Sequence, residues 1–253
     1  MKKFSNALDG KVVLVTAGAR RVGAAICRRL HAAGAQVMVN YLKSAKEARA
    51  LVNDLNTQRA DSAAMVKADL LASGAPDLLV KTTLRTFGRL DVVVNNASSF
   101  YATPVGKLNE SAWLDLVGVN LKAPLFIAQA AARELKKRRG CIINIVDIHA
   151  EFPLKDYVIY SIAKGGLAAL TRSLARELAP AVRVNGVSPG PILWPDTMIW
   201  KNPKTRKNIV ERTLLKHVGE PDDIARTVEF LITGAPYITG QIIAVDGGRS
   251  IAL

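Results

Sequence analysis

Short apolar segments and amphipathic helical segments alternate along the chain, and this alternation restricts the fold more than any other feature. The segments rich in Val and Ile are apolar throughout, without a polar residue at every second position. Strands of this kind are buried on both faces and are covered by the helices between them, which predicts a parallel sheet. The predicted strands are 11–16, 35–41, 62–70, 90–97, 141–147, 182–188 and 241–248. The predicted helices are 21–33, 44–58, 76–87, 111–138 (disturbed near Pro124), 158–178, a piece near 203–215, and 221–232.

The chain of 253 residues shows no linker, repeat or low-complexity tract, which predicts one doubly wound α/β domain over 1–253. Apolar residues make up 49% of it, enough for a large core and too many for a disordered chain. No apolar run reaches the ~18 residues of a membrane span, and the first residues do not resemble a signal peptide. In a sheet of this kind, ligands bind at the carboxyl ends of the strands.

Cysteine and histidine usage points to a reducing compartment and to no metal site. Cys27 and Cys141 fall in a helical and a strand segment, and we expect buried free thiols there, with a disulfide as the alternative. This predicts a cytoplasmic protein. No cluster of His and Cys has metal-ligand spacing, so His149 is interpreted as a loop residue.

The formal net charge of +14 is compatible with nucleic acid, a membrane surface or small anions. The densest basic stretches are 133–140, at the end of a predicted helix, and 201–207. Neither alternates basic with aromatic residues, as binding of single strands would require. An anionic small ligand is therefore favoured over nucleic acid and membrane.

The turn after the first strand, 16–23, carries Gly18 and Gly23 with Arg21 between them. A glycine-bearing turn lets backbone N–H groups approach a pyrophosphate at a helix N-terminus, and an arginine there adds charge-assisted hydrogen bonds. We expect cofactor contacts from Gly18, Arg20, Arg21 and Val22. The alternatives are a purely structural turn and a solvated arginine pair.

The end of the second strand predicts the cofactor. NAD enzymes place an acid there for the ribose hydroxyls, whereas this chain has Tyr41, Lys43 and Ser44, which favour a 2′-phosphate and hence NADPH. The alternative is that Ser44 only caps the next helix and Lys43 is solvated. Further cofactor contacts are expected at the ends of strands three and four, where turn chemistry alone is the alternative. These residues are Asp69, Leu70, Asn95, Ala97 and Ser98.

Tyr160 and Lys164 lie four residues apart on a predicted helix and share a face. A phenol has a pKa near ~10, and a neighbouring ammonium group lowers it, which makes the pair a proton donor. Together with the glycine turn, Asn95-Asn96-Ala97, Asn120 and Pro189-Gly190, this order and spacing resembles the short-chain dehydrogenase/reductase family over essentially the whole chain.

The resemblance implies a Rossmann-type sheet of seven strands, often a homotetramer, and roles for several residues. Tyr160 would be the acid–base group, and Lys164 would bind the nicotinamide ribose and lower the pKa of Tyr160. Asn120 would hold a water in a proton relay. Pro189, Gly190 and Ile192 are expected at the cofactor. The region 189–217 would form the substrate-binding loop and helix, with Pro191, Trp194, Met198 and Trp200 as candidates for its wall.

Two departures from the family pattern narrow the resemblance to pteridine reductases. Asp147 stands where the family usually has serine, and Arg21 replaces a glycine, although Ala17 departs even from this subgroup. The subgroup implies that Phe100 and the nicotinamide enclose a flat pterin ring. It also implies that Ser98 contacts cofactor and substrate and that Arg21 reaches both.

The chemistry of an acid beside Tyr160 fits a heterocyclic substrate. An ionised Asp147 would raise the pKa of the phenol, and the pair would share a proton that it delivers to a ring nitrogen. A structural role for Asp147 and core packing for Phe100 are the alternatives. We therefore predict NADPH-dependent reduction of a dihydropterin, such as dihydrobiopterin, dihydromonapterin or dihydrofolate, to its tetrahydro form. The basic stretch 201–207 would attract the glutamate tail of a folate. The alternative functions are a carbonyl reductase and a non-catalytic NADPH-binding module.

Overall fold

The computed structural model describes residues 7–194 and 201–252, so Met198 and Trp200 lie outside the described residues. Seven parallel strands form one sheet in the order β3-β2-β1-β4-β5-β6-β7. Their bounds are β1 Val12–Val15, β2 Gln36–Tyr41, β3 Ala63–Lys67, β4 Val92–Asn95, β5 Cys141–Ile145, β6 Arg183–Pro189 and β7 Ile242–Val245. The predicted parallel sheet of seven strands is confirmed, and each strand falls within a predicted segment except β6, which extends to Pro189.

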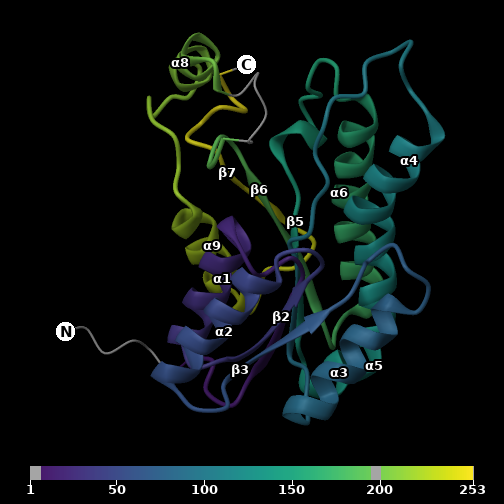
Figure 1. Ribbon diagram of the computed structural model, residues 1–253, viewed down its shortest axis with the longest axis vertical. Helices are drawn as coiled ribbons and strands as arrows, with labels where there is room; N and C mark the ends of the chain where they lie inside the picture. Colours follow the sequence, from purple (N-terminus) through teal and green to yellow (C-terminus); the bar gives the residue numbers. More distant parts are fainter. Residues whose placement is uncertain (1–6, 195–200, 253) are drawn as a thin grey trace.

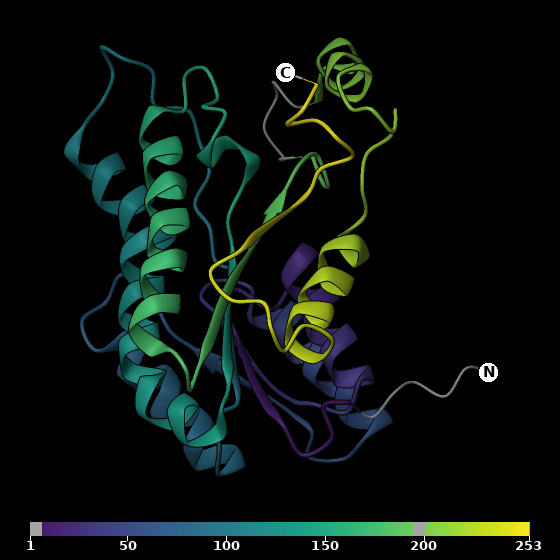
Figure 2. The same cartoon turned by 180° about the vertical axis from the view of Figure 1, so that it is seen from behind.

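Helices cover both faces of this sheet. In Figure 1, α1, α2 and α9 lie on one side of the strands and α3, α5 and α6 on the other, and the same layers are seen from behind in Figure 2. The helices are α1 Arg21–Ala32, α2 Ala45–Gln58, α3 Ala75–Phe87, α4 Glu110–Val117, α5 Ala123–Arg138, α6 Val158–Leu178, α8 Pro203–Glu211 and α9 Pro221–Thr233.

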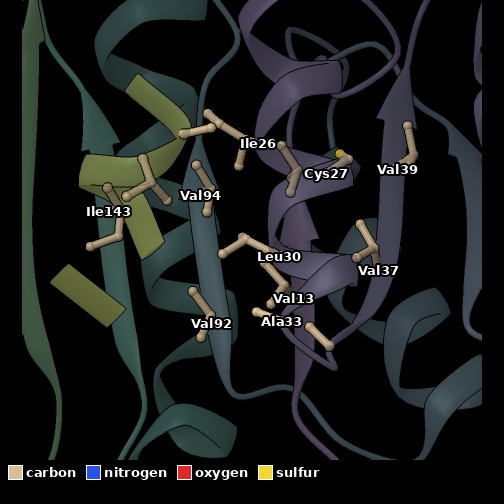
Figure 3. Close-up of a cluster of buried hydrophobic side chains, with 14 of the residues drawn as sticks. Val13, Ile26, Cys27, Leu30, Ala33, Val37, Val39, Val92, Val94 and Ile143 are labelled. Carbon is tan, nitrogen blue, oxygen red and sulfur yellow. The ribbon is translucent and has the colours of Figure 1, made fainter. Parts of the chain in front are cut away.

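The core follows from the alternation of side chains along the apolar strands. Val13, Val37 and Val94 point to one face, where they pack with Ile26 and Leu30 of α1 (Figure 3). The intervening residues, such as Leu14, Met38 and Val93, point to the other face and pack with α3 and α5. Both faces of the central strands are thus buried, as is typical of strands that are apolar throughout.

The long helix predicted over 111–138 is interrupted by a π-helical turn, Gly118–Lys122, which separates α4 from α5. Pro124 does not break the helix itself, because it lies in the first turn of α5, where no intrahelical N–H bond is lost. The piece predicted near 203–215 ends at Glu211. Asn120 lies on the π-helical turn, so the interruption falls at a predicted site residue.

By length and composition alone, the continuous helical stretch Glu110–Arg138 is apolar enough to cross a membrane. However, 44% of its most apolar window is buried against the rest of the chain, and a core helix passes the same test. This stretch is therefore weak support for a membrane segment.

The two cysteines are buried and free, as predicted. Burial raises the pKa of both thiols, that of Cys141 to about 11, so each remains protonated at neutral pH. Neither thiol is therefore suited to nucleophilic chemistry.

Candidate active site

Side chains from β2 and from the end of β4 form hydrogen bonds with the backbone of the turn after β1. The N–H of Ala17 donates to Oδ1 of Asn40 at 3.2 Å, and Nδ2 of Asn96 donates to the carbonyl oxygens of Thr16 and Ala17 at 3.0 and 3.2 Å. The hydroxyl of Thr16 accepts from the backbone N–H of Asn96 and Ala97. Asn96, the second residue of the double asparagine, thus fixes the backbone of the turn.

Close approach explains one glycine of this turn. A Cβ at Gly23 would lie 2.4 Å from the carbonyl oxygen of Ala17, which only glycine avoids. Ala17 itself has a φ of +47°, in the left-handed region that favours glycine. The replacement of glycine by Ala17 therefore leaves the turn mildly strained.

Arg21 connects this turn to the loop after β6. Its Nη2 donates to the carbonyl oxygens of Leu193 and Trp194, both at 3.2 Å. The side chain of Arg21 is exposed, as the alternative of a solvated arginine expects, and its guanidinium is at the same time hydrogen-bonded to that loop. Arg20 instead faces α2, where its Nη1 lies 3.7 Å from a carboxylate oxygen of Glu47, and both side chains are largely exposed.

The ends of β2 and β3 hold the residues predicted for the adenosine half of a dinucleotide. Lys43 is exposed, and Ser44 occupies the N-cap of α2 without a side-chain capping bond, so its hydroxyl is not used as a cap. Oδ1 of Asp69 accepts from the N–H of Leu71 at 2.9 Å, which is turn chemistry. The half-buried side chain of Val22 packs against the core on the α1 face of the sheet, and that of Leu70 packs against the core on the α3 and α5 face.

Asp147 and Tyr160 meet at the carboxyl end of β5. The hydroxyl of Tyr160, in the first turn of α6, donates to Oδ2 of Asp147 at 2.7 Å. Oδ1 of Asp147 accepts from the N–H of His149 at 2.8 Å, because Asp147 caps a short 3₁₀ helix, Ile148–Ala150. Both carboxylate oxygens are thus oriented, and the acid faces the tyrosine as predicted.

Lys164 lies one helical turn beyond Tyr160 and is 2% exposed. Its Nζ donates to the carbonyl oxygen of Ile145 at 2.9 Å and lies 5.7 Å from the centroid of the Tyr160 ring. Burial lowers its pKa to about 8, and the charge of Asp147 opposes that shift. Lys164 is therefore within reach of Tyr160 but does not form a hydrogen bond with its hydroxyl.

The pKa of Tyr160 corrects one expectation. Burial first, and then the charge of Asp147 and the hydrogen bond to it, raise this pKa well above its usual value, while a hydrogen bond with Ser98 acts in the opposite direction. The rise expected from Asp147 is therefore confirmed, whereas the lowering expected from Lys164 does not outweigh burial and Asp147. The phenol holds its proton firmly and acts as a hydrogen-bond donor.

Asn120 is fully buried, and its amide is already occupied. Its Oδ1 accepts from the hydroxyl of Ser98 at 2.7 Å, and its Nδ2 donates to the carbonyl oxygens of Ser99 and Leu116, both at 2.9 Å. This network ties the end of β4 to the π-helical turn. Asn95 points elsewhere: its Nδ2 donates to Oδ1 of Asn144 inside the sheet at 2.8 Å.

Phe100 is held by two aromatic neighbours. Its ring stacks on Tyr157 with centroids 4.6 Å apart and meets the ring of Tyr160 edge-on at 4.8 Å. Sequence reasoning missed Tyr157, although an aromatic residue three positions before Tyr160 would share its helical face. The contact fixes the orientation of the Phe100 ring beside the reacting groups.

A cavity of about 270 Å³ opens over Asp147 and Tyr160. Its walls contain the predicted residues Phe100, Pro191 and Trp194, and Leu193 and Ile209 fall within the predicted region 189–217. The full lining is Phe100, Asp147, Ile148, His149, Leu154, Tyr160, Pro189, Gly190, Pro191, Ile192, Leu193, Trp194, Ile209 and Arg249. Besides His149, the sequence analysis missed Ile148, Leu154 and Arg249, which carry no periodic signal that would have marked them in advance.

Of the predicted substrate residues, the cavity gathers Phe100, Asp147, Tyr160, Pro191 and Trp194. Arg21 contacts its wall at Leu193 and Trp194, whereas Ser98 does not line it and donates to Asn120. Tyr41, Lys43, Ser44 and the 68–70 turn lie at the ends of β2 and β3, towards the other edge of the sheet (Figure 1). Within residues 7–194 and 201–252, no group of three His, Cys, Asp or Glu could hold a metal ion.

Comparison with known proteins places this site in a family. A family model described as enoyl-(acyl carrier protein) reductase matches residues 17–250. The chain belongs to the short-chain dehydrogenase/reductase family. It is 37% identical to pteridine reductase 1 of Leishmania tarentolae, over 95% of this chain and 96% of that protein. It is 35% identical to a 3-oxoacyl-[acyl-carrier-protein] reductase of Synechocystis, over 96% and 98% of the two chains.

A solved structure of a blue fluorescent protein from a metagenomic library, in complex with NADPH, is similar throughout. It covers 96% of this chain and 99% of its own, with a TM-score of 0.89 and 35% identity. The predicted family and fold are thus confirmed, and the chain is an NAD(P)-dependent oxidoreductase of the short-chain dehydrogenase/reductase family.

Proposed function

We propose that the protein is an NADPH-dependent reductase of a dihydropterin, giving the tetrahydro form. The single observation that carries this proposal is the 2.7 Å hydrogen bond from Tyr160 to Asp147 in a cavity walled by Phe100. An acid at this position suits a C=N substrate, because a ring nitrogen must gain a proton when the adjacent carbon gains hydride. The relative named pteridine reductase 1 supports the same substrate class.

NADPH would supply the hydride, leaving NADP⁺. The choice of NADPH over NADH is supported by Lys43 and Ser44 at the end of β2, where an acid would repel a 2′-phosphate. The structure of the metagenomic protein with NADPH supports the same choice. Backbone N–H groups of the turn 16–23 and the segment Pro189–Ile192 would hold the dinucleotide, and Asn96 keeps that turn open.

The protein's own groups would bind the ring and deliver the proton. Phe100, fixed against Tyr157, offers a flat apolar face to a heterocycle. Tyr160 keeps its proton because burial and Asp147 raise its pKa, so the hydroxyl can donate to a ring nitrogen and be reprotonated through Asp147. Each turnover consumes one NADPH and one proton for each C=N bond reduced.

NADPH oxidation, measured against dihydropterins, dihydrofolate and carbonyl compounds, tests the proposal. The Asp147→Ser variant restores the residue that the family usually has and should lose dihydropterin reduction by about 100-fold or more, with NADPH affinity unchanged. Full dihydropterin activity in this variant would overturn the proposed mechanism. Absence of turnover with every substrate would favour a non-catalytic NADPH-binding module.

A carbonyl reductase is the second candidate. It is favoured by the relative named 3-oxoacyl-[acyl-carrier-protein] reductase, whose name specifies a ketone. In that case Asp147→Ser would keep or gain activity on a ketone, since a serine hydroxyl orients a carbonyl oxygen. The same variant therefore separates the two candidates.

We also propose self-association, consistent with the homotetramer that the family resemblance implies. Large apolar side chains are exposed on α4 and α5, among them Trp113, Leu114, Leu125 and Phe126 at 38–61% exposure. Unpartnered apolar residues on adjacent helices favour burial against another copy. Light scattering on a size-exclusion column gives the mass directly, and Trp113→Glu should shift it toward the 27.2 kDa monomer. A monomeric wild-type protein would contradict this proposal.

A further inference from the structure

Arg249 is a buried cation in the wall of the cavity, and its environment differs from that of the other cavity residues. It is 9% exposed and follows β7, where the chain passes beside α8 (Figures 1 and 2). It lines the same cavity as Asp147, Tyr160 and Phe100. A guanidinium group is therefore placed within the space that would receive a substrate.

One nitrogen of this guanidinium lacks a hydrogen-bond partner within residues 7–194 and 201–252. This atom, Nη1, is buried and has no hydrogen-bond acceptor there. Asp246 is close in the chain, but its two carboxylate oxygens accept from the N–H groups of Gly248 and Ser250 at 2.9 and 2.7 Å. Burial and the neighbouring Arg212 lower the pKa of Arg249, with Asp246 opposing them. The carboxylate of Asp246 thus acts on Arg249 through its charge, but no hydrogen bond from the guanidinium to it is formed among the described residues.

Burial of a guanidinium nitrogen without an acceptor lowers the stability of the folded protein. A buried charge without a partner loses its hydration and gains no hydrogen bond in return. An anionic oxygen that entered the cavity would supply the missing acceptor, and arginine binds carboxylates with two parallel hydrogen bonds. The geometry therefore predisposes this wall to bind an anion.

The position of Arg249 favours the substrate over the cofactor as the source of this anion. Its neighbour Ser250 and the acid Asp147 line one small second cavity of about 50 Å³, which places the segment after β7 against the reacting acid. The segment Pro189–Ile192, which would also hold the dinucleotide, lines the larger cavity. The turn 16–23 and the residues after β2, which are the candidates for the cofactor phosphates, line neither cavity. The anion should therefore belong to the molecule that Asp147 and Tyr160 act on.

We propose that Arg249 binds a carboxylate on the substrate, so that the preferred dihydropterin carries an acidic substituent. The identity of the ring rests on the proposed function, whereas the binding of a carboxylate at Arg249 does not. Arg249 is thus a specificity-determining residue, separate from the proton-transferring pair.

Thermal melting with p-aminobenzoylglutamate, the acidic tail of folate without its pterin ring, tests the carboxylate site independently of turnover. The compound should raise the Tm of the wild-type protein and leave that of Arg249→Met unchanged. Without ligand, Arg249→Met should melt at a higher temperature than wild type, because an unpaired buried charge has been removed. The matched control is Arg212→Met, which removes a nearby exposed cation and should retain the response to the ligand.

Steady-state kinetics then tests the substrate class. In Arg249→Met the KM for dihydrofolate should rise about tenfold or more, while the KM for the uncharged dihydrobiopterin should change less than twofold. Arg249→Gln, which keeps a polar side chain, should show the same split and serves if the methionine variant does not fold. Equal losses for both substrates, or a lower Tm of the ligand-free variants, would make Arg249 a structural residue and overturn the proposal. If neither pterin is reduced, the proposed function fails, and the melting response alone decides whether Arg249 binds a carboxylate.

Discussion

The reacting end of the cleft, around Tyr160, and the end beyond β2, around Lys43, hold their polar side chains in different ways. At the reacting end, Tyr160 and Lys164 are 3% and 2% exposed and are fixed by hydrogen bonds of 2.7 and 2.9 Å to Asp147 and Ile145. Beyond β2, Lys43 is exposed and Ser44 makes no capping bond. The side chains at the first end are thus fixed by the protein itself, whereas the side chain of Lys43 extends into solvent.

This difference predicts how substitutions at the two ends should behave. Buried, preorganised groups interact strongly because water is excluded around them. Exposed charges are screened, and each contributes little. Substitutions at the reacting end should therefore change the rate by orders of magnitude, and those beyond β2 should change affinity modestly and in a salt-dependent way.

The largest effect is expected for Tyr160→Phe. Removal of the hydroxyl deletes the proton donor and leaves Asp147 without its 2.7 Å partner. The kcat for dihydropterin should fall by about 10³-fold or more, in the upper range for loss of a general acid. The Kd for NADPH, measured by fluorescence titration, should stay within about threefold of wild type. A kcat within tenfold of wild type would mean that Tyr160 is not the proton donor.

Lys164 should leave a signature in the pH dependence of stability. Its pKa is about 8 in the folded protein, against an ordinary value of 10.5 that applies to the unfolded chain. Between pH 8 and pH 10.5 the unfolded chain therefore binds more protons at this residue than the folded protein does. This group alone should therefore raise the free energy of unfolding by about 2 kcal/mol between pH 7 and 9.5. The raised pKa values of Cys27 and Cys141 act in the opposite direction over part of this range, so the prediction concerns the difference between the wild type and Lys164→Met.

Urea denaturation of the ligand-free protein at both pH values measures this rise, and Lys164→Met provides the reference without the titrating group. The raised pKa of Tyr160 acts only above its usual value near ~10, so this range avoids it. The same slope in both proteins would show that Lys164 titrates with an ordinary pKa despite its burial.

At the opposite end, Lys43→Ala should weaken the preference for NADPH. The exposed ammonium would face the 2′-phosphate in solvent, so kcat/KM with NADPH should fall about five- to tenfold, with little change for NADH. Raising the salt concentration should reduce the difference between wild type and variant. Lys46→Ala, an exposed lysine in the first turn of α2, is the control and should have a smaller effect. A wild-type preference for NADH would contradict the assignment of Lys43 and Ser44.

The sequence allowed prediction of the sheet but only part of the site, and the reason differs between residues. The strands were predictable because burial on both faces makes them apolar throughout. Asp147, Tyr160 and Lys164 were predictable because they are tied to one strand end and one helix. By contrast, Arg249 lines the cavity because of the course that the chain takes after β7. No motif or residue spacing near Arg249 predicts that course.

The pKa shift of Tyr160 was predicted only in part, for a related reason. From the sequence, Lys164 is expected to lower this pKa and an ionised Asp147 to raise it, and the spacing does not show which effect is larger. Burial is a property of the complete packing, and here it is the largest cause of the rise. The residues of a site can therefore be predicted from the sequence, but the direction in which their pKa values shift requires the structure.

The smallest expected effect lies in the turn that separates the two ends. Ala17 has a φ of +47°, which costs a residue with a Cβ about 1–2 kcal/mol, whereas glycine loses about 0.5–1 kcal/mol in backbone entropy. Ala17→Gly should therefore stabilise the protein slightly, by roughly 0.5 kcal/mol. Ala19 is the matched control, since it lies in the same turn without a positive φ and is 6% exposed. Ala19→Gly should destabilise, because it adds chain entropy and removes a buried methyl group. If Ala17 is strained, the urea midpoint should rise in Ala17→Gly and fall in Ala19→Gly, relative to wild type. If both variants are less stable than wild type, the turn accommodates Ala17 without strain, and the departure from glycine has no energetic cost.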